Sequence, residues 1–163
     1  MRKKTKKIFF IFFSILLVVL SFKQSSAQQW SLNGLETSDY RKVVVVIENL
    51  SEDAINIGLT QERIRTKCEL RLRQAGLEPL SRLNEKSECL YINIHVVGFA
   101  YHISLEFRRL IYFDAGMISY RTVSATWKIG ATGTHGRDPE SIIQGLDGRL
   151  DNFLNEYLKA NSK

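Results

Sequence analysis

The fold is decided by residues 90–128, which read LYINIHVVGFAYHISLEFRRLIYFDAGMISYRTVSATWK. Apolar and polar residues alternate through most of this stretch, as they do in strands that bury one face. The pair Gly98-Phe99 fits a two-residue type II′ turn, and this turn places Ile94 opposite Ile103. The stretch therefore predicts an antiparallel meander with one apolar and one polar face.

A second turn is predicted at Asp114-Ala115-Gly116, where a three-residue loop puts glycine at its left-handed position. Both turns then agree on a single apolar face. The second turn predicts these cross-strand neighbours: Phe107 with Val123, Leu105 with Ala125, Ile103 with Trp127, Arg109 with Arg121, Leu110 with Tyr120, and Tyr112 with Ile118.

The far end of this second hairpin is apolar on both faces. Contiguous apolar surface with aromatic residues is typical of protein contacts. As an alternative, Trp30 and the segment around it, or the first strand, fold over this end and make it part of the core. The interface hypothesis rests on four residues that interrupt the otherwise polar face: Leu110, Tyr112, Ile118 and Tyr120.

Elements on either side of the meander complete the fold. A β-branched run at 43–47 predicts a central strand within 41–50. Thr60 and Gly76 are suited to cap a helix between them, and Asp138 followed by Pro139 is typical of the start of a second helix. A short strand near 77–83 is also possible.

Both helices must cover the one apolar face of the sheet. We therefore expect an α+β fold, a two-layer sandwich whose mainly antiparallel sheet carries two helices packed on one face. The expected order is strand, helix, possible short strand, three strands, helix.

The first 27 residues have the pattern of a signal peptide. A basic start precedes an apolar run at 8–20, and Ser25-Ser26-Ala27 provides small residues for cleavage. We expect residues 1–27 to be the signal peptide, 28–40 a flexible lead-in and 41–163 a single domain. The protein is then exported, to the periplasm or the outside of the cell. If the signal is not cleaved, it remains as a membrane anchor and is the chain's only membrane contact.

The positive charge of the chain belongs to its start. Six of the 23 basic residues and none of the acidic ones lie in residues 1–27, which leaves 17 basic against 17 acidic residues. A neutral domain has no net field to attract a phosphate backbone. We therefore expect no nucleic-acid partner.

Histidine offers the only candidate for metal chemistry. His95 and His102 are predicted cross-strand neighbours on the polar face, with Glu106 further along it. Two ligands are fewer than zinc requires, so two exposed histidines are the simpler interpretation. The alternative is a small metal-binding protein or hydrolase that uses this face. Since the sequence has no GxSxG, HExxH or CxxC motif, we expect a non-catalytic protein without a cofactor.

Three further patterns favour structural roles. Cys68 and Cys89 permit a disulfide in an exported chain, but their strand and helix phases differ, so free thiols are favoured. Residues 130–136 are rich in glycine without a phosphate-loop spacing and predict a flexible connector. Five basic residues lie on the first helix and predict a solvated face rather than an anion site: Arg63, Arg65, Lys67, Arg71 and Arg73.

The chain resembles a group of small exported bacterial proteins for which no activity is established. The resemblance rests on the segments 59–62 (LTQE), 69–77 (ELRLRQAGL), 90–92 (LYI), Thr126-Trp127 and the closing helix with Phe153, Tyr157 and Asn161. The layout is also similar to the amino-terminal α/β domain of the Tol-system protein TolB. The resemblance implies a binding or assembly module whose partner is an envelope protein or a second copy of itself.

Overall fold

The computed structural model describes residues 33–80 and 88–162. The predicted signal peptide, Trp30 and the end of the expected short strand at 81–83 lie outside these residues.

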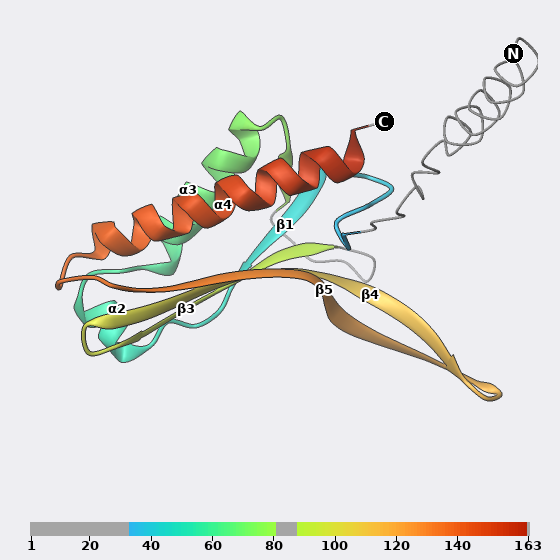
Figure 1. Cartoon of the computed structure of the whole chain (residues 1–163), viewed down its shortest axis with the longest axis horizontal. Coiled ribbons are helices and arrows are strands. Elements are labelled where there is room, and N and C mark those ends of the chain that lie inside the picture. The colour runs from blue at the N-terminus through green and yellow to red at the C-terminus, as the bar shows by residue number, and fades with distance from the viewer. Residues whose placement is uncertain (1–32, 81–87, 163) are drawn as a thin grey trace, which may run out of the picture. The chain divides into compact units, whose positions relative to one another are not determined.

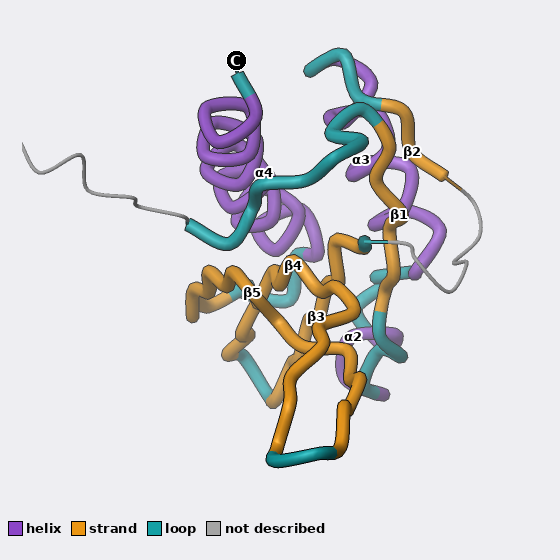
Figure 2. Tube along the Cα trace, turned by 90° about the vertical axis from the view of Figure 1, so that its right-hand side faces the viewer, coloured by secondary structure: helices purple, strands orange, loops and turns teal. Residues whose placement is uncertain are grey.

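The described residues form one five-stranded sheet, and its two long helices cover one face (Figure 1, Figure 2). The strands are β1 (Lys42–Ile47), β2 (Glu78–Leu80), β3 (Cys89–Val97), β4 (Ala100–Ala115) and β5 (Ile118–Thr134), in the spatial order β2-β1-β3-β4-β5. The helices are α2 (Glu52–Asn56), α3 (Gln61–Gln74) and α4 (Pro139–Asn161). β1 is parallel to both of its neighbours, whereas β3, β4 and β5 are antiparallel. The predicted α+β sandwich is confirmed.

The two long helices begin where the sequence predicts, and α3 also ends where it predicts. The Thr60 hydroxyl accepts a hydrogen bond from the Arg63 amide at 3.1 Å, and the Asp138 carboxylate accepts one from the Glu140 amide at 2.9 Å. Gly76 follows α3 with φ +79°, a conformation that favours glycine. Local capping chemistry thus fixes both helices before any tertiary contact is considered.

The short helix α2 is an element that the sequence analysis missed. Ser51 precedes it, but the Ser51 hydroxyl donates to the Val96 carbonyl at 3.1 Å and makes no capping bond to the helix. Asp53 accepts a hydrogen bond from the Gly98 amide at 2.9 Å. α2 is therefore held by the end of β3 and the β3–β4 turn. Its position depends on these contacts with distant residues, so the local sequence does not predict it.

The predicted pairing of the first hairpin is confirmed. Ile94 lies opposite Ile103, Ile92 opposite Leu105, and Gly98 begins the turn with φ +57°. The inner face of this hairpin meets α4 in a cluster of aromatic rings. The Phe107 ring lies 6.1 Å from that of Phe153 and 5.5 Å from that of Tyr157, measured between centroids.

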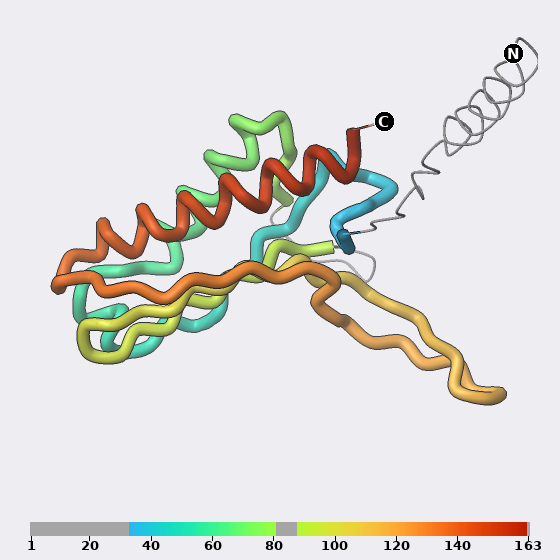
Figure 3. Tube along the Cα trace, viewed as in Figure 1, coloured from blue at the N-terminus to red at the C-terminus, as the bar shows by residue number. Residues whose placement is uncertain are grey.

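Residues 33–40 are part of the folded domain. The prediction of a flexible lead-in is wrong for them, because Leu35 is completely buried in the core. The side chain of Asn161 donates to the Leu35 carbonyl and accepts from the Thr37 amide, both at 3.0 Å. The Tyr157 hydroxyl donates to the Tyr40 carbonyl at 2.9 Å. We call residues 33–37 the strap; it lies between the end of α4 and the outer half of β4 and β5 (Figure 3).

Gly34 is the tightest point of the strap. Its φ of +82° suits glycine, and a Cβ added there would lie 2.1 Å from the Thr126 carbonyl oxygen. Gly58 has nearly the same φ, +86°, but a Cβ added there would meet nothing within 4 Å. A comparison of alanine substitutions at the two glycines therefore distinguishes the cost of a positive φ, which both share, from the cost of steric overlap, which arises only at Gly34.

We predict that Gly34→Ala lowers the midpoint of thermal unfolding much more than Gly58→Ala does. The Gly58 variant has only the cost of a left-handed alanine, about 1–2 kcal/mol, whereas the Gly34 variant must also displace the strap from β5. Circular dichroism melts of the two variants and the unchanged chain give the comparison. Equal losses would mean that the strap does not hold Gly34 against β5.

Candidate functional site

β4 and β5 continue past the rest of the sheet as a two-stranded projection. Phe107 pairs with Trp127 but Arg108 pairs with Ala125, so Thr126 is an extra residue in β5 and forms a β-bulge. Beyond this bulge the hairpin extends away from the helices (Figure 1, Figure 3). We call residues 108–125 the hairpin arm.

The register predicted for this hairpin is wrong, because its turn is shorter than expected. The turn has two residues, Gly116 and Met117, and its flanking pair is Ala115 with Ile118. Gly116 has φ +67°, so the glycine occupies the first turn position and not the end of a three-residue loop. The observed neighbours are Phe107 with Trp127, Leu105 with Ile129, Ile103 with Ala131, Arg109 with Ser124, Leu110 with Val123, and Tyr112 with Arg121.

This correction divides the four candidate interface residues between two faces of the arm. Leu110 and Tyr112 lie on one face, where Tyr112 is beside Arg121. Ile118 and Tyr120 lie on the other face, where Tyr120 pairs with Phe113 and the two rings stack at 5.4 Å. The expectation that the end of the hairpin is apolar on both faces holds, although the residues are distributed differently.

The arm exposes large apolar side chains. The exposed fractions run from 44% for Tyr120 to 104% for Met117, and Tyr112 is 70% exposed. Leu110 is half-buried. Six residues of the arm are exposed large hydrophobics: Tyr112, Phe113, Met117, Ile118, Tyr120 and Val123.

Two of the segments proposed to cover this end of the hairpin do not reach it. β1 lies inside the sheet between β2 and β3, and the strap contacts the base of the arm. Trp30 is outside the described residues. Among the residues that the structure describes, the end of the arm is therefore open on both faces.

Two neighbouring arginines fix the base of the arm from opposite faces. The Arg109 guanidinium donates to the carbonyls of Gly34 and Glu36 at 2.8 and 2.6 Å, so it ties the strap to β4. The Arg108 guanidinium lies on the other side, 3.4 Å from the centre of the Tyr91 ring. Since both arginines are engaged within the chain, the base of the arm is rigidly positioned and its end is left free.

The sheet face away from α3 and α4 carries a network of charges centred on Glu106. This carboxylate accepts from Lys128 at 2.8 Å and from Arg108 at 2.6 Å. The hydrogen bond from Lys128, followed by the contact with Arg108, holds the pKa of Glu106 below its usual value. The pKa of Glu48 is lowered in the same way, first by its hydrogen bond from Asn93. The charged and polar side chains of this face are thus paired with one another: Glu106 with Lys128 and Arg108, and Glu48 with Asn93.

The two histidines of this face are neighbours, as predicted. His95 pairs with His102, both are exposed, and the His102 Nδ1 lies 3.1 Å from the Thr132 hydroxyl. Glu106, the third group considered as a metal ligand, is held by its two cations. Within residues 33–80 and 88–162, no group of three or more potential metal ligands is gathered.

The glycine-rich stretch at 130–136 is mostly strand, which corrects the prediction of a flexible connector. A Cβ added at Gly130 would lie 3.2 Å from the His102 ring, and one added at Gly133 would lie 2.7 Å from the Tyr101 ring. These glycines make room for cross-strand side chains. His135 is buried; its Nδ1 accepts from the Arg137 amide, so its Nε2 donates to the Gly98 carbonyl at 2.9 Å.

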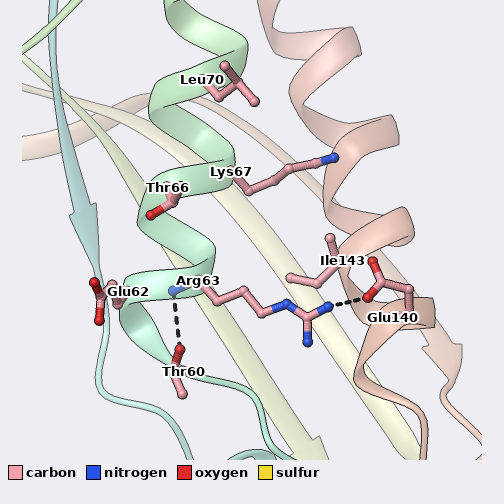
Figure 4. Close-up of a pocket in the computed structure, with 8 residues that line it drawn as sticks. All are labelled: Thr60, Glu62, Arg63, Thr66, Lys67, Leu70, Glu140 and Ile143. Atoms are coloured by element: carbon pink, nitrogen blue, oxygen red, sulfur yellow. Dashed lines mark hydrogen bonds and ion pairs between the residues drawn. The ribbon is translucent and has the colours of Figure 1, made fainter.

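The basic side chains of α3 form ion pairs with α4 and with their own helix. A groove of about 490 Å³ lies between the two helices. Figure 4 shows Arg63 directed at Glu140 across it. Lys67 pairs with Asp147 at 2.6 Å. The remaining three pairs are Arg71 with Asp151, Arg65 with Glu69, and Arg73 with Glu69. All five basic residues are thus paired within the chain, which disfavours an anion site here.

Cys68 and Cys89 are free thiols on different sides of the sheet. Cys68 belongs to the core under α3, whereas Cys89 pairs with Val44 on the opposite face of the sheet. Burial raises the pKa of Cys68 to about 12 and also raises that of Cys89. Both thiols are therefore protonated and poorly reactive at neutral pH.

Neither a scan against protein-family models nor a search of the curated proteins finds a match for this chain. None of the helices in the described ranges is long and apolar enough to cross a bilayer.

We predict that Glu106→Gln destabilises the protein by about 1–3 kcal/mol at neutral pH, since two cations lose their charged partner. The pKa of Glu106 is lowered in the folded protein, so its contribution is present above the ordinary value of 4.5 and is lost as pH falls. Urea titrations of the variant and the unchanged chain at several pH values measure the gap, which should close below pH 4.5. Glu62→Gln, at an exposed carboxylate in the first turn of α3, is the control and should cost less than about 1 kcal/mol.

We also predict that neither cysteine reacts readily with a thiol reagent in the folded protein at mildly alkaline pH. Both should react quickly once urea unfolds the chain, because unfolding removes the burial that raises their pKa values. Mass spectrometry of labelled peptides distinguishes Cys68 from Cys89. Rapid labelling of Cys89 alone in the folded protein would contradict the prediction and would mean that the Cys89 thiol becomes exposed to solvent without unfolding of the core around Cys68.

Proposed function

We propose that this protein is an exported, non-catalytic binding module that uses the hairpin arm to contact a partner in the cell envelope. The observation that carries the proposal is the set of exposed apolar side chains at the end of the arm, beyond a base held by Arg108 and Arg109. The N-terminal signal pattern supports export. The paired charges of the sheet face and of α3 leave the arm as the surface best suited to a partner.

The chemistry of the arm favours a protein as that partner. Residues 110–123 contain one acidic and one basic residue, Asp114 and Arg121, so this part has no net charge to attract a polyanion. Past Arg108, the described strands pair only with each other, and one edge of each strand is left without a strand neighbour. Unpaired strand edges are costly inside a bilayer, whereas another protein can hydrogen-bond to them.

The double variant Tyr112→Ser with Tyr120→Ser should abolish partner capture but change the unfolding midpoint by only a few degrees, because both side chains are exposed. The matched control is Ile55→Ser, which removes an apolar side chain of 58% exposure on α2. Cross-linked envelope extracts from cells with each variant are compared by quantitative mass spectrometry.

The control should retain every protein that the unchanged chain captures, and the double variant should lose a defined subset. If the double variant unfolds, Tyr112 and Tyr120 are structural residues, and the interface proposal fails. It fails equally if the double variant folds and captures the same proteins as the control.

A further inference from the structure

We infer that the partner of the hairpin arm is a second copy of this chain, joined to it by antiparallel pairing of β5 with β5. This inference rests on the proposed function, because it names the occupant of the same surface. It requires a strand edge that can pair, a register that fits itself under two-fold symmetry, and enough apolar area. The hairpin arm supplies all three.

Among the described strands, none pairs with the outer edge of β5 in the arm, so this edge is ready for pairing. Residues flanking a two-residue turn form a hydrogen-bonded pair, so Ala115 and Ile118 are such a pair and, two residues on, Phe113 and Tyr120 are another. The backbone groups of Tyr120 therefore point to β4. Those of the alternate residues point to the open edge of the sheet: Ser119, Arg121 and Val123.

A two-fold axis allows only a few registers, and the charges select among them. With Arg121 opposite itself, two like charges would be direct neighbours, which is unfavourable. With Thr122 opposite itself, Ile118 would meet Thr126. This register is unfavourable because Thr126 lies in the bulge and its hydroxyl donates to the Gly34 carbonyl of the strap at 2.6 Å. Axes nearer the turn than Tyr120 pair fewer residues. The favoured register therefore places Tyr120 opposite Tyr120 of the second copy.

This register complements itself on both faces. On one face it aligns Phe113 and Tyr120 with the same two residues of the second copy, giving a row of four aromatic rings. On the other face Arg121 lies opposite Ser119 of the second copy, whose other neighbour is that copy's Asp114. Arg121 and Asp114 of the second copy, which carry opposite charges, are then separated only by the second copy's β5. At the end of the arm, the fully exposed Met117 comes beside Val123 of the second copy.

The exposed area of the arm matches what such a contact needs. The six exposed apolar side chains amount to about four fully exposed ones. Taking ~150–250 Å² for an aromatic side chain and somewhat less for an aliphatic one, this is roughly 700 Å² on each copy. A stable interface of standard size buries about 800 Å² per partner, so the exposed apolar area of one arm is of the order that such a contact needs.

Cysteine cross-linking tests the register in the purified chain. Residues at a non-hydrogen-bonded position lie about 4.5 Å apart between Cα atoms, within the range of a disulfide. Tyr120→Cys should therefore form a disulfide-linked dimer under mild oxidation at least tenfold faster than Thr122→Cys. Thr122 is the matched control because it is exposed on the same face and strand but pairs with Ile118 of the second copy. The unchanged chain reports any background from Cys68 and Cys89.

Arg121→Pro tests the backbone pairing by sedimentation velocity. Its amide points to the open edge, so proline leaves the hairpin intact but removes a hydrogen bond of the dimer. We expect the unchanged chain to sediment as a dimer and Arg121→Pro to dissociate more than tenfold more readily. If Arg121→Pro does not fold, the comparison of the two cysteine variants decides.

Three results would overturn the inference: a monomeric unchanged chain at high micromolar concentration, equal cross-linking of the two cysteine variants, or an undisturbed dimer in folded Arg121→Pro. A monomer that still loses captured proteins in the Tyr112 and Tyr120 double variant would leave the proposed function standing with a different protein as partner. A monomer that floats with phosphatidylcholine vesicles would identify a lipid surface instead.

Discussion

The hydrogen bond from the Thr126 hydroxyl to the Gly34 carbonyl joins parts of the chain that lie 92 residues apart. It forms where the extra residue of β5 breaks the regular ladder, so the bulge, the strap and the base of the arm meet at one point. On the side of the bulge toward the body, at residues 127–134, alternate residues of β5 such as Trp127 and Ile129 face the helices and pack against the core. Beyond it the phase of β5 shifts by one residue, and the sheet continues as a ribbon of two strands. The separation of the protein into a packed body and an open arm depends on this junction.

Much of the fold follows from local chemistry. The helix caps at Thr60 and Asp138 and the first hairpin at Gly98 could be predicted because each depends on residues adjacent in sequence. The second turn could not be fixed by pattern alone, since Gly116 has a positive φ in either of two turn types, and the bulge at Thr126 restores the apolar pairing of Phe107 with Trp127 that the shorter turn alone would lose. Thr126 carries no local signal of a bulge, which left the phase of the arm undetermined. α2 and the strap depend on partners far away in the chain, and their own sequences are polar.

For the candidate surface, too, some features could be predicted from neighbouring residues and others depend on residues distant in sequence. That the end of the long hairpin is apolar can be read from its composition. Which side chains share a face depends on a single turn residue, and this reassigned Tyr120 from the neighbourhood of Leu110 to that of Phe113. Conversely, three of the five basic side chains of α3 have acidic partners on α4, and the sequence pattern of α3 could not show these pairs because the partners are distant in sequence. Arg63 and Glu140 are separated by 77 residues and are brought together by the packing of α3 against α4.

The contact between Asn161 and the strap also sets an order on folding. The carbonyl of Leu35 and the side chain of Asn161 lie 126 positions apart, so this bond cannot form until the chain has been synthesised as far as Asn161. Closing so long a loop is slow compared with forming the helices and the first hairpin, which rely on near neighbours. During synthesis, the meander and α3 can therefore assemble while Leu35 is still outside the core. The base of the arm acquires this support only when the end of α4 arrives, so the hairpin arm becomes fixed in direction after the meander has formed.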